Sequence, residues 1–145
     1  MATVSTYLNF KRSTEDAFSF YRSVFKTEFT APIVRYTSMP PCPEMPPVAE
    51  TDKNLVLHVA LPILGGHLLM GSDTDACMPN QLKQGNSVYI NLHPDTREEA
   101  DRLFRELSAG GEVEMPMQDM FWGDYFGSFA DRFGTRWMIA CSAKA

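Results

Sequence analysis

The sequence predicts an α+β fold made of two βαβββ modules, each with a curved antiparallel sheet, and three observations lead to this prediction. The string YLNF at residues 7–10 returns as YINL at 89–92, 82 positions later. An apolar pattern with helical spacing follows each copy. Each half then closes with a glycine and a methionine four residues apart: Gly66 with Met70, and Gly134 with Met138. A repeat too short to bury its own apolar face usually pairs with its twin, so we expect the site in the groove between the copies.

The first module is expected over residues 1–72. Apolar and polar residues alternate from 3 to 10, which is typical of a strand. Ser13 followed by Asp16 indicates a helix start, and the apolar spacing continues the helix to about Lys26. Five of the ten prolines fall at 40–47, so this segment is predicted to be an excursion loop. The remaining expected strands are 29–36, 55–63 and 67–72, the last two joined at Gly65 and Gly66.

A polar linker at 73–86 leads to the second module at 87–145, and both modules are expected to form one domain, 1–145. The order of elements repeats. Asp95 and Glu98 form a second capping pair, and Gly110 ends the helix that follows it. The expected strands are 87–93, 112–118, 125–130 and 135–141, with a turn at 131–134 before the last one.

Composition excludes two classes of partner. The net charge is −5 and no cluster of Lys and Arg occurs, which argues against nucleic acid. No apolar stretch is long enough to span a membrane, so no membrane partner is expected either. The three cysteines, Cys42, Cys77 and Cys141, are odd in number and far apart, which favours reduced thiols in a cytoplasmic protein.

The repeat, with several local strings, resembles the vicinal oxygen chelate superfamily, which includes glyoxalase I and the bleomycin and fosfomycin resistance proteins. Within it, the chain looks like the PhnB-like branch. The strings that carry the resemblance lie in order along nearly the whole chain: YLNF at 7–10, EDA at 15–17 with FY at 20–21, LLMGSD at 68–73, FWG at 121–123, YFG at 125–127, DRFG at 131–134 and WMI at 137–139.

The resemblance implies positions for one divalent metal ion, held by the first and last strands of each module. On this chain those positions fall at Thr6, Met70, Val88 and Met138. A register error of two leaves Val4, Leu8, Asn86, Ile90, Arg136 and Ala140. A hard or borderline cation needs imidazole or carboxylate donors, so we expect neither the usual metal nor another cofactor. The methionine pair suits either a soft Cu(I) ion or the filling of an irregular interior, and the second reading is favoured.

Histidine and cysteine offer the remaining candidates for chemistry. His58 alternates with Val56 and Ala60, so it is the candidate general base. His58 and His67 flank the Gly65 turn and could face each other, whereas His93 precedes a proline at a strand end. Cys42 and Cys77 are the candidate nucleophiles, although Asp73 and Asp75, taken as solvated like Glu98 and Glu99, would raise the pKa of Cys77. The chain has no G-x-G-x-x-G turn for a methyltransferase cofactor.

The segment 115–126 holds three methionines, two phenylalanines, a tryptophan and a tyrosine around a turn. It is predicted to cover the core or a dimer contact, or to form the aromatic wall of a small-molecule pocket. In the pocket reading Trp122 and Tyr125 stack on the ligand, and Gln118 or Arg136 orients its polar end.

Two functions follow from these features. The first is a metal-free protein that binds a small molecule in the cleft between the modules, lined by Met70, Met138 and the aromatic segment. The second is an enzyme on the same scaffold, either metal-dependent or using acid–base chemistry at His58. The resemblance also implies a homodimer, formed by module exchange or by pairing of sheet edges.

Overall fold

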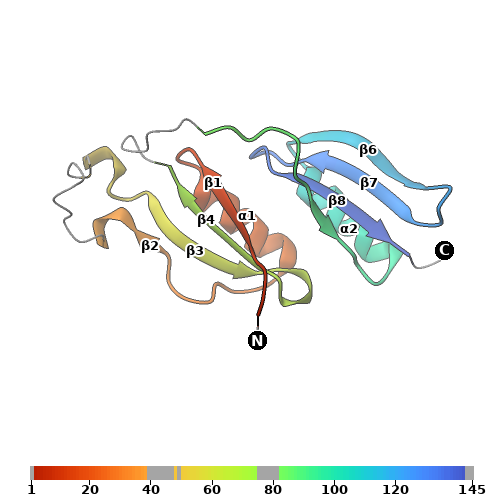
Figure 1. Ribbon diagram of the computed structural model, residues 1–145, viewed down its shortest axis with the longest axis horizontal. Helices are drawn as coiled ribbons and strands as arrows, with labels where there is room; N and C mark the ends of the chain where they lie inside the picture. The colour runs from red at the N-terminus through yellow and green to blue at the C-terminus, as the bar shows by residue number, and fades with distance from the viewer. Residues whose placement is uncertain (1, 39–47, 49, 75–81, 143–145) are drawn as a thin grey trace. The chain divides into compact units, whose positions relative to one another are not determined.

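The computed structural model describes residues 2–38, 48, 50–74 and 82–142 (Figure 1). The chain divides into two compact units, Met1–Lys83 and Gln84–Ala145. Each unit contains one four-stranded sheet and one α-helix. The boundary falls inside the predicted linker at 73–86, and the union of both units in one domain stays a prediction. No helix in the described part of the chain is long and apolar enough to cross a membrane.

The first module follows the predicted order of elements. Its strands and helix are β1 (Thr6–Phe10), α1 (Thr14–Phe25), β2 (Val34–Arg35), β3 (Val56–Pro62) and β4 (Leu68–Asp73). Short 3-10 turns lie at Tyr36–Ser38, Glu50–Asp52 and Leu64–Gly66. β2 is much shorter than the strand predicted at 29–36, because Pro32 cannot donate to a ladder and the register shifts between Val34 and Arg35. The prolines at 40–47 lie outside the described residues, as do Cys42 and Cys77.

The second module repeats the order with longer strands in its hairpin. Its elements are β5 (Ile90–Leu92), α2 (Arg97–Ser108), β6 (Glu112–Asp119), β7 (Tyr125–Ala130) and β8 (Arg136–Cys141). The predicted architecture of one strand, one helix and three strands in each module is therefore confirmed.

The strand directions correct one part of the prediction. The sheet orders are β1-β4-β3-β2 and β5-β8-β7-β6. The first strand of each module pairs in parallel with the last, while the other neighbours are antiparallel. The sheets are open and mixed rather than wholly antiparallel. The helix after the first strand returns the chain to the end of the sheet at which that strand began, so the next strand runs in the same direction as the first.

Each helix covers one face of the sheet in its own module (Figure 1). Gly71 of β4 faces α1 closely, since a Cβ there would lie 2.6 Å from the ring of Phe18. The fully buried residues on the helix-covered faces include Ala17, Phe18, Tyr21, Leu61 and Leu69 in the first module, and Ala100, Leu103, Leu107, Trp137 and Ile139 in the second. We call the opposite face of each sheet its open face, because no described helix of the same module lies on it.

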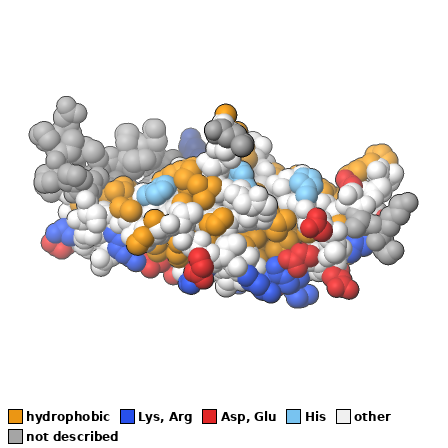
Figure 2. All heavy atoms as spheres, turned by 90° about the horizontal axis from the view of Figure 1, so that it is seen from below, with side chains coloured by type: hydrophobic (Ala, Val, Ile, Leu, Met, Phe, Trp, Pro, Cys, Tyr) orange, Lys and Arg blue, Asp and Glu red, His pale blue; other side chains and the backbone are white. Residues whose placement is uncertain are grey.

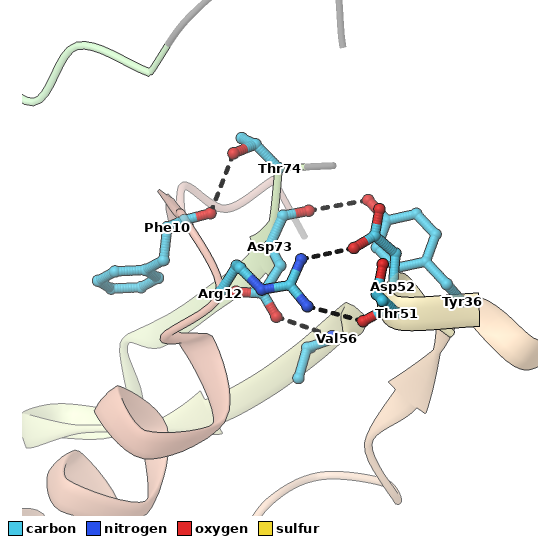
Figure 3. A network of polar contacts seen from close by, with 8 residues as sticks. All are labelled: Phe10, Arg12, Tyr36, Thr51, Asp52, Val56, Asp73 and Thr74. Atoms are coloured by element: carbon cyan, nitrogen blue, oxygen red, sulfur yellow. Dashed lines mark hydrogen bonds and ion pairs between the residues drawn. The ribbon is translucent and has the colours of Figure 1, made fainter. Parts of the chain in front are cut away.

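A buried aspartate supplies the start of α1, contrary to the reading of Asp73 as solvated. Asp73 ends β4 with only 3% of its surface exposed. Its Oδ1 accepts hydrogen bonds from the backbone and hydroxyl of Thr14, at 3.0 and 2.8 Å. Its Oδ2 accepts one from the backbone of Val56 (Figure 3). The Ser13 side chain makes no capping hydrogen bond. Asp73 therefore ties α1, β3 and β4 together.

A second contact in the same region fastens the turn at Glu50–Asp52. Arg12 has a positive φ of 66° and directs its guanidinium to the Asp52 carboxylate and the Thr51 carbonyl (Figure 3). The hydroxyl of Tyr36 donates to the backbone oxygen of Asp73, 2.8 Å away. These bonds fix the described chain on both sides of residues 39–47.

The start of α2 is capped in a different way. Thr96, not Asp95, is the N-cap, and its hydroxyl accepts from the backbone N–H of Glu99 at 3.1 Å. The predicted pair of Asp95 and Glu98 was therefore wrong by one residue. Glu98 is exposed as expected, while Glu99 makes an ion pair with Arg102 on the next turn. Figure 2 shows such oppositely charged side chains next to one another on the molecular surface.

Candidate functional site

The open face of the first module carries a stacked pair of rings. Leu69 and Gly71 face α1, so Met70 lies on the open face, where its neighbours are Tyr7 on β1 and Ala60 on β3. The hydroxyl of Tyr7 lies 3.5 Å from Nδ1 of His58, and the two rings stack with centroids 5.9 Å apart. His58 thus lies on the open face, and its role as a general base stays a prediction.

His58 and His67 do not face each other. Nε2 of His67 lies 2.8 Å from the Thr6 hydroxyl, while His58 contacts Tyr7. Thr6 pairs with Leu69, which is fully buried, so its position belongs to the helix-covered side and not to the side of Met70. The position beside Met70 is that of Tyr7, one residue away from the position that the resemblance implied.

The open face of the second module is larger. Trp137 and Ile139 of β8 are buried against α2, so the alternate residues Arg136, Met138 and Ala140 lie on the open face. The sheet register places the other members of this face beside them: Asn91 next to Met138, Ser128 on the other side of Met138, and Phe126 between Ala140 and Gln118. Val88, the other implied metal position, precedes β5 and is 76% exposed.

A charged cluster lies at one end of this face. Glu114 of β6 accepts from the Tyr89 hydroxyl at 2.9 Å and 3.0 Å, and Nη1 of Arg136 donates to the same carboxylate. Since β7 lies between β6 and β8, Glu114 reaches across a strand whose residues there, Ser128 and Ala130, are small and buried. The hydrogen bond to Glu114 raises the pKa of Tyr89 above its ordinary value of 10.0.

Arg136 has one unsatisfied donor. Its Nε is buried and has no hydrogen-bond partner among the residues that the structure describes. A buried donor without an acceptor costs free energy, and because this nitrogen is closed to solvent, an acceptor from outside the chain does not reach it.

Aromatic side chains lie at the other end of the face, at the turn of the β6–β7 hairpin. Phe121 is 97% exposed and Trp122 is 52% exposed. Their rings are in edge contact with centroids 5.0 Å apart, and Trp122 also contacts Phe126 at 6.0 Å. The indole N–H of Trp122 donates to Asp124 at 3.2 Å. The turn therefore displays a cluster of rings to solvent instead of burying it.

Tyr125 lies on the other side of the sheet from Gln118 and Phe126. Its hydroxyl donates to Asp101 of α2 at 2.6 Å, which raises its pKa, and the Arg97 guanidinium lies 4.5 Å from its ring centroid. Arg97 also pairs with Asp119, at the end of β6. The structure thus brings Trp122, Gln118, Met138 and Arg136 to one face, and it uses Tyr125 to fasten the hairpin to α2.

The family model of the Glyoxalase/Bleomycin resistance protein/Dioxygenase superfamily matches residues 7–139. The chain belongs to this superfamily. Protein PA1353 from Pseudomonas aeruginosa has a similar crystal structure, with a TM-score of 0.84, 31% identity, and coverage of 99% of this chain and 100% of that one. Protein YjdN of Escherichia coli (strain K12) is 29% identical over 141 residues, covering 94% of this chain and 92% of its own.

A PhnB protein from Bacillus cereus also shares the fold, with a TM-score of 0.74 and 24% identity over 97% of this chain and 99% of that one. The superfamily resemblance inferred from the repeat is therefore confirmed, and a PhnB protein is among the similar structures.

Some members of the superfamily hold a divalent metal ion, and the residues present on the open faces do not fit one. Beside Met70 stand Tyr7 and Ala60, and beside Met138 stand Asn91 and Ser128. The carboxylate of Glu114 in the second module already accepts from Tyr89 and Arg136. Among the described residues, no three His, Cys, Asp or Glu side chains form a group that could hold a metal. This donor set lacks what a hard cation prefers.

Sequence reasoning missed two of the residues that define the charged cluster, Tyr89 and Glu114. The repeat marked Tyr89 as the counterpart of Tyr7 but gave it no partner. Glu114 stands at an irregularity of register between Val113 and Met115, and this irregularity is not visible in the alternation of the sequence.

Proposed function

We propose that this chain is a PhnB-like superfamily member that binds a small molecule without a metal ion, on the open face of the second module. The observation that carries this proposal is the set of side chains that the sheet register brings together on this face: Gln118, Phe126 and Met138 on neighbouring strands, with Arg136 at one end.

The rest of the face has the composition of a small-molecule site. Ligand sites combine a mostly apolar surface with a few fixed polar groups. Here Met138 and Phe126 supply apolar surface, Gln118 and Asn91 supply amides, and Trp122 is available for stacking. The expectation that Met70 also contacts the ligand, in a cleft between the modules, stays a prediction.

Tryptophan fluorescence tests the proposal directly. The chain has two tryptophans, and Trp137 is fully buried with its indole N–H bonded to Asp131. Trp122 is half exposed, so ligand binding on the open face should change its emission alone. We expect hits from a library of small amphipathic compounds, and Trp122→Phe should abolish the signal without changing the emission of Trp137. Binding that persists undiminished in both Trp122→Ala and Arg136→Met would contradict this location.

A second candidate function is acid–base catalysis at the first open face. The Tyr7 hydroxyl lies 3.5 Å from Nδ1 of His58, so a small approach of the two rings would bring a phenol and an imidazole to the roughly 3 Å that proton transfer needs. His58→Gln and Tyr7→Phe should each abolish turnover of any substrate found, while the metal content measured by plasma mass spectrometry stays below stoichiometry. Stoichiometric zinc, nickel or manganese in protein purified without a tag would instead favour a metal-dependent enzyme.

Two further expectations extend the proposal to the whole protein. The edge strands β1, β2, β5 and β6 expose unpaired backbone groups unless they are covered, which favours a homodimer. Cys141 is a free, buried cysteine, in agreement with a reducing, cytoplasmic setting. Sedimentation equilibrium over a range of concentrations tests the dimer, and cell fractionation tests the location.

A further inference from the structure

We infer that the ligand carries an ammonium group, which binds at the turn of the β6–β7 hairpin between the ring of Trp122 and the carboxylate of Asp124. This inference rests on the proposed function, because it identifies the class of molecule that the open face of the second module binds. Three features of the module carry it: the aromatic rings at the turn, the carboxylate beside them, and the charge of the whole unit.

The first feature is a group of aromatic rings that is open to solvent. Phe121 is almost fully exposed and Trp122 is half exposed. The plane of the indole is inclined by 85° to the ring of Phe121 and by 67° to the ring of Phe126. The face of an aromatic ring carries partial negative charge, so it attracts a cation held within about 6 Å of its centroid, and tryptophan attracts most strongly. Rings at steep angles to one another can offer more than one such face to a single ammonium group.

The second feature is a carboxylate at the rim of the indole. Oδ2 of Asp124 accepts the hydrogen bond of the Trp122 indole N–H at 3.2 Å, which places negative charge beside the ring that the cation would cover. In the part of the chain that the structure describes, no Lys, Arg or His side chain pairs with Asp124. Asp119, before the same turn, pairs with Arg97 instead. The charge of Asp124 is therefore available to a cationic ligand, whereas that of Asp119 is balanced within the chain.

The third feature is the net charge of the second unit. Gln84–Ala145 contains ten Asp and Glu against six Lys and Arg, so with neutral histidine it carries 6 − 10 = −4 of the total charge of −5. A surplus of negative charge raises the local concentration of cations and lowers that of anions. At the other end of the open face, Arg136 and Glu114 balance each other, so this pair adds no preference for either sign.

The other side chains of the face indicate the rest of the molecule. Phe126 contacts the ring of Trp122 and pairs with Ala140, and Met138 follows on the same face. Because these side chains are apolar, the part of the ligand beyond the ammonium group is apolar or aromatic. The inferred class is therefore an amphipathic organic amine that is positively charged at neutral pH.

The test compares three probes with a similar phenylalkyl body: 4-phenylbutylamine, which is cationic at neutral pH, 4-phenylbutanol, which is uncharged, and 4-phenylbutyrate, which is anionic. Binding to the full chain is followed by NMR of the nitrogen-labelled protein at low salt, through the backbone amides of residues 121–126. We expect the ammonium to bind about tenfold more tightly than the alcohol, since a cation–π contact and a solvent-exposed ion pair are each modest. The butyrate should bind more weakly than the alcohol.

Two matched variants separate the site from the general charge of the unit. Asp124→Asn keeps an oxygen acceptor for the indole N–H but removes the charge, so the preference for the ammonium over the alcohol should fall from about tenfold to about threefold. Asp119→Asn removes the same charge from the same hairpin, at a carboxylate that is already paired, so the preference should change by less than about twofold.

A third variant tests the ring itself. Trp122→Leu keeps an apolar side chain but offers no aromatic face, so the affinity for the ammonium should fall more than the affinity for the alcohol. The buried indole of Trp137 is the reference in all three variants, since an unchanged N–H signal there shows that the second module is still folded.

The outcomes distinguish this inference from the proposed function. Equal affinities for ammonium and alcohol, or tighter binding of the butyrate, would overturn the ammonium inference while a ligand on the open face stands. An equal loss of preference in Asp124→Asn and Asp119→Asn would also overturn it, because the selectivity would then come from the general charge of the unit. If no probe binds, the inferred class is wrong, and the fluorescence screen decides whether the face binds anything. If the amides of residues 121–126 shift on dilution without a probe, a second copy of the chain covers the rings, and the ammonium site is excluded.

Discussion

In the first module the buried aspartate joins three elements, whereas in the second module it closes a single turn. Asp73 accepts from Thr14, 59 residues away in sequence, and from Val56, 17 residues away. Asp131 accepts from the backbone of Phe133 and Thr135 and from the indole of Trp137, all within six residues. A buried aspartate thus joins segments that are far apart in the sequence of the first module, whereas the aspartate of the second module joins residues that are close in sequence.

The open faces differ in a similar way. The tyrosine of the repeated string is Tyr7 in one module and Tyr89 in the other, but Tyr7 contacts the imidazole of His58 and Tyr89 contacts the carboxylate of Glu114. The register differs as well, because Tyr7 stands beside Met70 while Asn91, two residues after Tyr89, stands beside Met138. The repeated residues form corresponding strands and helices in both modules. The side chains that differ between the copies determine the polar contacts on each open face.

Removal of the two aspartates should give the largest effects. Asp73→Ala leaves the buried backbone donors of Thr14 and Val56 without an acceptor, so we expect a loss of about 3 kcal/mol in the free energy of unfolding of the first module. Amide hydrogen exchange should rise together at the start of α1 and in β3. Urea denaturation and exchange followed by mass spectrometry measure both quantities.

Asp131→Ala is the matched variant for this comparison. The donors that this substitution leaves without an acceptor lie in and just after one turn. The Phe133 amide is only partly buried and can be hydrated. Faster exchange should stay near residues 131–137. The contrast between the two modules is contradicted if Asp73→Ala raises amide exchange only in the segment next to residue 73, or if Asp131→Ala raises amide exchange throughout α2.

The helix starts allow a smaller but cleaner comparison. Thr96 caps α2 through its hydroxyl, whereas the Ser13 hydroxyl makes no such bond at α1. The backbone bonds are the same in both helices, from Ala100 to Thr96 and from Ala17 to Ser13. Thr96→Ala should therefore cost about 1 kcal/mol and Ser13→Ala only a few tenths. Equal losses in chemical denaturation would show that Asp73 does not replace the cap at Ser13.

The elements of the fold could be predicted from the sequence because their signals are local. Apolar spacing gives α1 and α2, and alternation with glycine turns gives the two hairpins. The strand directions and the burial of Asp73 could not be predicted, since they depend on partners tens of residues away. Asp73 begins a polar segment, so in sequence it has the features of a solvated residue, and only the approach of Thr14 makes it a buried acceptor.

The placement of the candidate site residues could be predicted only in part. Met138 was taken from the family resemblance, and Gln118 or Arg136 was assigned to the polar end of a pocket at the aromatic segment. All three lie on one face of the second sheet, and their role in binding stays a prediction. Tyr125 was grouped with Trp122 because the two are close in sequence. In the hairpin Tyr125 turns to the opposite side and bonds Asp101.

The smallest predicted effect concerns the tyrosines of the second module at high pH. Hydrogen bonds to Glu114 and to Asp101 raise the pKa of Tyr89 and of Tyr125 above the ordinary value of 10.0. A raised pKa in the folded state means that each bond contributes stability fully below pH 10 and loses it as the pH rises through the raised pKa. In the first module, the Arg35 hydrogen bond lowers the pKa of Glu15 below its ordinary value of 4.5, so that contribution is lost in acid instead.

Near-ultraviolet absorbance during alkaline titration of the folded protein follows the formation of phenolate. Tyr89→Phe and Tyr125→Phe should each remove one late-titrating phenol and leave the rest of the curve in place. Glu114→Gln provides the sharper test, because it removes the acceptor carboxylate while Tyr89 itself is retained. In that variant one late phenol should shift to lower pH, and an unchanged curve would mean that the bond between Tyr89 and Glu114 does not form in solution. The ion pair between Glu114 and Arg136 would then form without the support of the Tyr89 hydroxyl.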